Sequence, residues 1–258
     1  MRADTDPTAI SVVIPVYRSA ATLTELHTRL GAVLNEIGAG EIIYVNDASP
    51  DQSLALLRQL PPVIPFRILS LNTNKGQSTA LLCGIKAASC PLVATMDADL
   101  QDSPELLPAL LGGLSTGIDV VFAARSGTYE SPARHLSSFL FKSVVFLFSA
   151  GRIPRQAGLY LVMRKQSCSA FADFLPHRPY LMGLIARFRL KTGSVPFIRT
   201  RNPENETSYT FKKRLQVAKA FFRTLFLPVE TTAADIEKWW NSEITEYTPL
   251  HKTPENNP

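Results

Sequence analysis

The sequence is poor in cysteine and has no apolar run long enough to span a membrane as a helix. Its three cysteines, Cys83, Cys90 and Cys168, are odd in number and lack CxxC spacing, so they predict neither a disulfide framework nor a zinc site. A membrane-spanning helix needs about 20 apolar residues. The phenylalanine-rich run at 137–150 is shorter than this and contains Lys142.

A signal peptide is not predicted at the beginning of the chain. Arg2, Asp4 and Asp6 place charges there, and residues 10–16 already have the pattern of a core strand. The expected location is therefore the cytoplasm, with the inner face of the membrane as a second option. With 258 residues, 45% of them hydrophobic, the chain can bury the core of one large domain.

Charge is unevenly distributed along the chain, whose formal net charge is +5. Residues 229–258 contain six acidic side chains and two lysines, whereas residues 1–228 contain 25 basic and 16 acidic ones, a net charge of +9. We therefore expect an acidic, loosely ordered tail over 229–258, which Trp239 and Trp240 can anchor. The positive body favours an anionic partner, which can be a nucleotide diphosphate, nucleic acid or an anionic membrane.

Apolar, β-rich runs alternate with helical patterns over the first half of the chain. The expected strands are 10–16, 41–45, 66–71, 92–96 and 120–124, and the expected helices are 22–37, 53–60, 76–88 and 104–114. This alternation predicts an α/β fold in which a mostly parallel sheet is flanked by helices on both faces. Ligands bind such sheets beyond the carboxyl ends of the strands, so functional residues should lie there.

The second half has a different pattern. The phenylalanine-rich run predicts a helix that is buried, pairs two subunits in a homodimer or lies in a membrane interface. We expect a further strand at 159–163, a helical segment at 170–190 and a C-terminal helical extension. In that extension, a polar loop from residue 199 leads into a basic, aromatic helix that ends near residue 223.

Asp97 and Asp99 directly follow the strand expected at 92–96. Two carboxylates fixed at a strand end can hold a hard divalent cation against a substrate diphosphate, because Mg²⁺ takes one or two carboxylates and completes its shell with phosphate and water. Such a metal would offset the charge that develops on a leaving diphosphate. Taken alone, the pair fits a solvated loop equally well.

Other strand ends carry polar or aromatic groups. Asp47 can accept hydrogen bonds from a base or a ribose, and Pro15 and Tyr17 can form a wall beside the base. Lys75 and Gly76 precede a helix, where a cation and backbone N–H groups can meet phosphate oxygens. Each residue alone is typical of a turn, and only their arrangement at neighbouring strand ends favours a nucleotide site.

Four segments of the chain resemble, in order and spacing, family 2 glycosyltransferases of the GT-A fold. They are residues 12–17, 45–51, 74–77 and 96–102. Within the family, the resemblance is to the branch of dolichyl-phosphate mannose synthase and bacterial polyprenyl-phosphate glycosyltransferases. It covers about residues 10–225 and implies a GT-A domain over 1–228. The acceptor side and amphipathic helices of that domain are then expected at about 126–228.

The resemblance also implies roles for individual residues and an inverting reaction. Asp97 and Asp99 would bind the donor and its Mg²⁺ or Mn²⁺, and Gln101 would lie at the sugar–phosphate region. Asp99 and Gln101 are therefore the predicted catalytic residues. Together with the turn residues above, the predicted donor-binding set is Pro15, Tyr17, Asp47, Lys75, Gly76 and Asp97.

Phosphate or acceptor binding is predicted for four residues of the second half. Arg125 and Arg134 match positions where the branch carries arginines near a phosphate, and charge-assisted pairing supports this role. Arg201 and Ser208 belong to a late segment similar to an Arg…Ser-x-Tyr segment of the branch. A solvated loop charge is the alternative reading of both Arg125 and Arg134.

Gln156 marks a departure from the family, because relatives often carry an acid at this position. An acceptor that is already an anion needs no strong base, and a phosphate monoester is largely ionised at neutral pH. The leading hypothesis is therefore transfer of a sugar from a nucleotide-sugar donor to polyprenyl phosphate at the membrane face. Residues 139–148 and 212–223 would make a peripheral contact with the lipid.

Two alternatives remain open. The acceptor can be a saccharide hydroxyl in polysaccharide or glycoconjugate assembly, or the chain can be a nucleotide-sugar-binding module without catalysis. A nucleic-acid partner is not predicted, because the basic residues do not lie on a recognised reading element.

Overall fold

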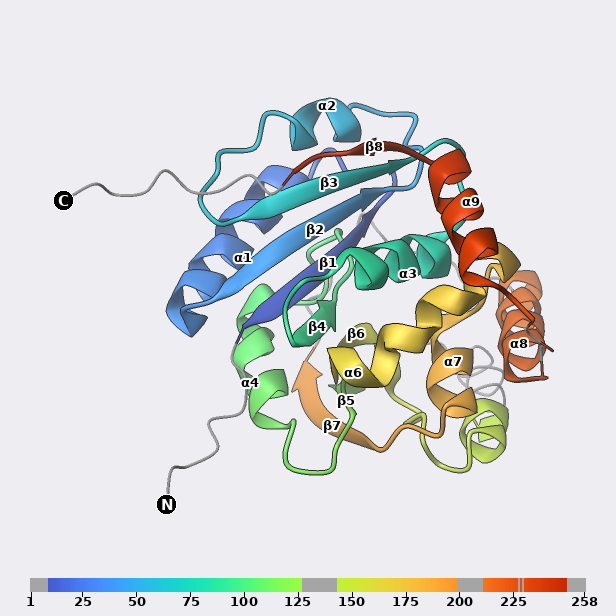
Figure 1. The fold of residues 1–258 in the computed structure, drawn as a ribbon. Helices are drawn as coiled ribbons and strands as arrows, with labels where there is room; N and C mark the ends of the chain where they lie inside the picture. Colours follow the sequence, from blue (N-terminus) through green and yellow to red (C-terminus); the bar gives the residue numbers. More distant parts are fainter. Residues whose placement is uncertain (1–8, 127–142, 199–210, 227, 229, 250–258) are drawn as a thin grey trace, which may run out of the picture.

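The computed structural model describes residues 9–126, 143–198, 211–226, 228 and 230–249 of the chain (Figure 1). The strands are β1 (Ile10–Val16), β2 (Gly40–Asn46), β3 (Phe66–Leu71), β4 (Leu92–Thr95), β5 (Val120–Ser126), β6 (Ala157–Arg164), β7 (Thr192–Ile198) and β8 (Ile244–Tyr247). The helices are α1 (Leu23–Ile37), α2 (Ser53–Leu57), α3 (Gln77–Ala87), η1 (Pro104–Leu106), α4 (Leu107–Gly112), α6 (Lys165–Cys168), η2 (Ser169–His177), α7 (Leu181–Arg187), α8 (Phe211–Phe226) and α9 (Ala233–Glu243).

The eight strands form one sheet in the order β7-β5-β6-β4-β1-β2-β3-β8. Strands β4, β1, β2 and β3 are parallel, so their carboxyl ends meet at one end of the sheet. Strand β6 is antiparallel to both of its neighbours, and β8 is antiparallel to β3. The sheet is therefore mostly parallel and flanked by helices, as the sequence predicted.

The central strands are buried on both faces, which is why they read as continuous apolar runs. In β1, Val13 packs into the core that includes α3, η2 and α7, whereas Val12 and Ile14 pack into the core that includes α1 and α4. Leu161 and Val162 of β6 divide between the two cores in the same way. Polar groups can therefore gather only at the ends of these strands.

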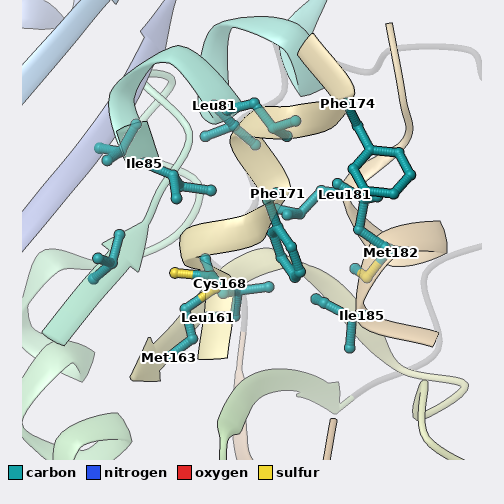
Figure 2. Packing of buried hydrophobic residues seen from close by; sticks show 14 of the residues in the cluster. Leu81, Ile85, Leu161, Met163, Cys168, Phe171, Phe174, Leu181, Met182 and Ile185 are labelled. Atoms are coloured by element: carbon teal, nitrogen blue, oxygen red, sulfur yellow. The ribbon is translucent and has the colours of Figure 1, made fainter. Parts of the chain in front are cut away.

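The core over one face fixes α3 on the sheet. Figure 2 shows Phe171 of η2 inside a cluster that also contains Leu81 of α3, Ile185 of α7 and Leu161 of β6, and all four are buried. Because α3 is held by this packing, the turn that precedes it has a fixed starting point. That turn contains two of the predicted donor-binding residues.

Residues 233–247 do not form the loosely ordered tail that the sequence predicted. They form α9 and β8, and β8 extends the sheet beyond β3. A capping box between Thr232 and Asp235 begins the helix. Trp239 and Trp240 pack against the core of the α3 face. This aromatic anchor keeps the segment ordered despite its acidic composition.

Two strands were not predicted. Strand β7 contains Gly193 and Pro196, which are uncommon in central strands, but it is the outer strand beside β5, where proline is tolerated. Strand β8 has only four residues. Of the predicted helix at 137–150, residues 143–148 are helical, and 137–142 lie outside the described residues. Within the part of the chain that the structure describes, no helix combines the length and apolar character needed to cross a membrane.

Gly84 allows α3 to lie directly on β1. A Cβ atom added at Gly84 would be 2.1 Å from Cγ1 of Val13. We expect Gly84→Ala to lower the free energy of unfolding by about 1–3 kcal/mol, as overpacking of a core does. The control is Gly112→Ala at the end of α4, where a Cβ atom meets nothing within 4 Å. Urea unfolding compares the two, and equal losses would contradict the close contact.

Candidate active site

The predicted donor-binding residues lie at one end of the sheet. Pro15 is the second-last residue of β1, Asp47 directly follows β2, and Asp97 follows β4 by two residues. Lys75 and Gly76 lie in the turn between β3 and α3. The carboxyl-end rule therefore placed these residues correctly, and hydrogen bonds join several of them.

Asp47 is a buried carboxylate at the end of β2, with 3% of its surface exposed. One carboxylate oxygen accepts a hydrogen bond from the N–H of Lys75 at 2.6 Å, and the other accepts from the N–H of Gly76 at 2.8 Å. Burial raises the pKa of Asp47, while these N–H groups and the charges of Lys75 and Arg178 oppose the rise. Gly76 has a φ of 87°, a left-handed value that favours glycine.

The groups of Lys75 and Gly76 that the sequence assigned to phosphate make internal contacts in this structure. Their N–H groups bind Asp47, and the ammonium group of Lys75 lies 2.8 Å from a carboxylate oxygen of Glu243 in α9. Direct phosphate binding by these residues stays a prediction.

Tyr17 and its loop form the side of the site next to β1. The tyrosine is 43% exposed, and the guanidinium of Arg18 lies 5.5 Å from the centre of its ring. The hydroxyl of Ser49 accepts a hydrogen bond from the N–H of Arg18 at 2.8 Å, and Ser49 in turn donates to Asp51 at 2.6 Å. An exposed ring held at a strand end can stack on a planar base.

Asp97 and Asp99 form the carboxylate pair of the site, and both are half-buried. The side-chain amide of Gln77, the first residue of α3, donates a hydrogen bond to Oδ1 of Asp97. Oδ1 of Asp99 accepts from the N–H of Gln101 at 3.1 Å, across a turn in which Leu100 has a φ of 59°. The start of α3 is thus tied to the end of β4.

This carboxylate pair fits a hard divalent cation. Among the described residues, no group of three or more His, Cys, Asp or Glu side chains is placed to hold a metal ion. Mg²⁺, however, commonly takes one or two protein carboxylates and fills the rest of its shell with phosphate and water. The oxygen chemistry of Asp97 and Asp99 suits Mg²⁺ or Mn²⁺ bound together with a diphosphate.

Of the four residues predicted to bind phosphate or the acceptor, the structure describes only the backbone of Arg125. Arg125 lies near the carboxyl end of β5, which runs parallel to β4, so its backbone is at the same end of the sheet as Asp97. Arg134, Arg201 and Ser208 lie outside the described residues.

Three residues of the site were not assigned a role from the sequence. Gln77 directly follows the predicted Lys75–Gly76 turn, and that position was the available signal. Glu243 reaches the turn from α9, and Arg178 contributes positive charge near Asp47. Neither belongs to a local motif, so only the fold brings them to the site.

Comparison with known proteins identifies the family. The model described as Glycosyl transferase family 2 matches residues 11–166, which is more than half of the chain. The chain belongs to glycosyl transferase family 2. All four segments of the predicted resemblance fall within the match, and each of them reaches or follows the carboxyl end of a strand of this family 2 protein.

Curated relatives of this family 2 protein are longer than it is. The chain is 28% identical over 211 residues to the uncharacterized glycosyltransferase YkcC of Bacillus subtilis, covering 81% of this chain and 65% of that protein. It is 34% identical over 182 residues to the undecaprenyl-phosphate 4-deoxy-4-formamido-L-arabinose transferase of Aeromonas hydrophila, covering 67% of this chain and 56% of that protein. The chain thus spans less than two thirds of the length of these relatives.

Solved structures confirm the GT-A fold of the family 2 domain. Glucosyl-3-phosphoglycerate synthase of Mycobacterium tuberculosis superposes with a TM-score of 0.59 at 16% identity, covering 86% of this chain and 82% of that chain. The same enzyme in complex with Mn²⁺, UDP and phosphoglyceric acid gives a TM-score of 0.58 at 15% identity, covering 86% and 80%. Likeness at this level of identity is a likeness of fold.

Asp51 stabilises the site loop in a pH-dependent way. Burial opposes its ionisation, but hydrogen bonds from Ser49, Ser53 and Ala20 outweigh it and lower the pKa to about 2 from 3.8. Because the folded pKa is the lower one, the contribution of Asp51 is complete above about pH 4 and is lost as the pH falls through 2. We expect Asp51→Asn to be less stable than wild type at pH 7.

The difference between wild type and Asp51→Asn should shrink between about pH 4 and pH 2. Urea unfolding midpoints of both proteins, measured from pH 2 to 7, test this. A difference that stays constant over the whole range would show that the charge of Asp51 does not stabilise the fold.

Proposed function

We propose that this family 2 transferase moves a sugar from a nucleotide-sugar donor to polyprenyl phosphate, with inversion at the anomeric carbon. The observation that carries the proposal is the connection of the Asp97–Asp99 pair to the Asp47 turn through Gln77. It puts a carboxylate pair suited to a metal diphosphate next to a buried carboxylate suited to a nucleoside. A nucleoside diphosphate has these two chemistries side by side.

In this proposal each part of the donor has its own residues. Asp47 accepts hydrogen bonds from the base or ribose, and Tyr17 and Pro15 cover the base. Asp97 and Asp99 hold Mg²⁺ or Mn²⁺, which when bound supplies positive charge to the leaving diphosphate. The Mn²⁺ and UDP in the structurally similar synthase support this assignment.

Gln101 is proposed to act at the sugar–phosphate end of the donor. The N–H group of Gln101 donates a hydrogen bond to Asp99, so the position of Gln101 is fixed relative to the proposed metal ligand. Arg125, Arg134, Arg201 and Ser208 are proposed to bind phosphate on the acceptor side, where arginine matches phosphate geometry.

The proposed acceptor follows from the absence of a general base at position 156. Gln156 is an exposed amide just before β6 and cannot serve as a general base. A polyprenyl phosphate is already an anionic nucleophile and needs no base of this kind. Relatives named as undecaprenyl-phosphate transferases support the same acceptor class.

A thermal-shift screen tests the donor site. We expect one of UDP-, GDP- or dTDP-sugars to stabilise the wild-type protein in the presence of Mn²⁺, by about 2.7 kcal/mol at a hundredfold excess over Kd. In Asp99→Asn this metal-dependent stabilisation should be lost, and sugar transfer should fall by about 10²-fold or more.

Asp173→Asn in η2 is the matched control, because Asp173 lies outside the four motifs, and it should behave as wild type. No stabilisation of the wild type by any donor would refute the donor site. If the protein transfers sugar to a saccharide but not to polyprenyl phosphate, the proposed acceptor is wrong and the proposed glycosyl transfer still holds.

We also propose that an apolar surface next to α8 contacts the membrane that holds the polyprenyl phosphate. Phe148 packs edge-on against Phe222 of α8 with ring centres 4.8 Å apart, so residues 143–148 and α8 form one surface. Lys219 and Arg223 of α8 are exposed and suit anionic headgroups. The exposed apolar residues of this phenylalanine patch are Val144, Phe146, Leu147, Phe148, Leu215 and Phe226.

Vesicle flotation tests the phenylalanine patch. Leu147 is 72% exposed, so Leu147→Glu should leave the fold intact and reduce binding to phosphatidylglycerol-containing vesicles by about tenfold or more. Val63→Glu makes the same type of change at a 41% exposed valine before β3 and should bind as wild type. No flotation of wild type, or a dimer that Leu147→Glu dissociates, would assign the patch to another role.

A further inference from the structure

Residues 232–248, named here the C-terminal strap, form α9 and β8. They lie beside β3 and reach the candidate donor site. Figure 1 shows β8 running along β3 and α9 beside the turn that joins β3 to α3. The N–H of Thr248 donates to the carbonyl of Ile68 at 3.0 Å, and the N–H of Ile68 donates to the hydroxyl of Thr248 at 2.8 Å. The family match ends at residue 166, well before the strap.

The strap holds the β3–α3 turn at three points. The N–H of Asn72 donates to the carbonyl of Glu243 at 2.9 Å, and the side-chain amide of Asn72 donates to the carbonyl of Ser242 at 2.9 Å. The ammonium group of Lys75 lies 2.8 Å from the carboxylate of Glu243. These two charged side chains are only 9% and 17% exposed, so water screens their attraction much less than it would at the surface.

The ion pair acts on the same turn that binds Asp47. The backbone N–H groups of Lys75 and Gly76 hold the two carboxylate oxygens of Asp47, while the side chain of Lys75 extends to Glu243. If Glu243 loses its charge, the buried ammonium group of Lys75 loses its ion-pair partner, keeps only the more general attraction of Asp47, and is drawn toward water. Because the Lys75 side chain makes one of the three contacts between the strap and the turn, its release loosens the turn that lies between β3 and α3.

We propose that Glu243 is a positioning residue for donor binding: it holds Lys75, and thereby the turn that orients Asp47 toward the nucleoside. Lys75 then connects the strap to the turn, and the donor phosphates are bound by other groups. The inference rests on the proposed function, because it takes Asp47 as the nucleoside contact. The opposite role, in which Glu243 keeps Lys75 away from the phosphates, predicts tighter diphosphate binding when Glu243 is neutralised.

Two variants of the full chain separate this role from a general effect on the strap. Glu243→Gln removes the charge opposite Lys75. Glu246→Gln is the matched control, because Glu246 pairs with Arg58 after α2 and leaves the Lys75 contact in place. Both variants remove one ion pair from the same strap.

Two measurements are made on wild type and both variants. Hydrogen exchange follows the backbone amides of residues 72–79, and calorimetry gives the affinities for UDP, GDP and dTDP with Mn²⁺ and for the corresponding nucleosides. In Glu243→Gln we expect faster exchange over 72–79 and binding weakened about five- to tenfold, by the same factor for nucleoside and diphosphate. Glu246→Gln should stay within about twofold of wild type in both measurements.

Exchange and affinities that are the same in the two variants overturn the inference, and so does tighter diphosphate binding by Glu243→Gln. Weakening confined to the diphosphate overturns it as well, since Lys75 would then act on phosphate. All three results leave the proposed function intact. If the wild type binds none of the nucleotides, both the proposed function and this inference fail.

Discussion

The two hydrogen bonds from the Lys75–Gly76 turn to Asp47 connect parts of the molecule that are distant in sequence. A buried carboxylate is costly to ionise unless polar partners meet its oxygens, and here two backbone N–H groups do so. They join the end of β2 to the start of α3, and Gln77 then joins α3 to the end of β4. The site is a connected unit because this one carboxylate needs partners that its own strand cannot provide.

Much of the fold follows from the sequence, because central parallel strands are buried on both faces. Strands β1 and β3 have the predicted bounds, since each is a mostly apolar run that ends at a turn signal. Strand β7 could not be predicted, because Gly193 and Pro196 are tolerated only through its place at the outside of the sheet. Strand β8 is stabilised by partners far away, such as the Thr245 contact with Ser70 across 175 residues.

The candidate site was predictable to the extent that it consists of strand ends. Asp47 and Asp97 could be placed together from the order of strands alone. The partners that orient them could not: Gln77 acts through the exact start of α3, and Glu243 reaches Lys75 only because the strap packs beside the sheet. The acidic segment looks disordered by composition, but it is ordered because Trp239 and Trp240 pack against the core and β8 pairs with β3.

The position of β8 also affects how the protein is made. At typical synthesis rates of 5–20 residues per second, roughly 10–30 s pass between the emergence of β3 and that of β8 from the ribosome. During that interval β3 is an outer strand with unpaired backbone groups, open to pairing with another nascent chain. The strap closes that strand last. Conditions that slow translation of the C-terminal region should therefore prolong the period in which the growing chain is prone to aggregate.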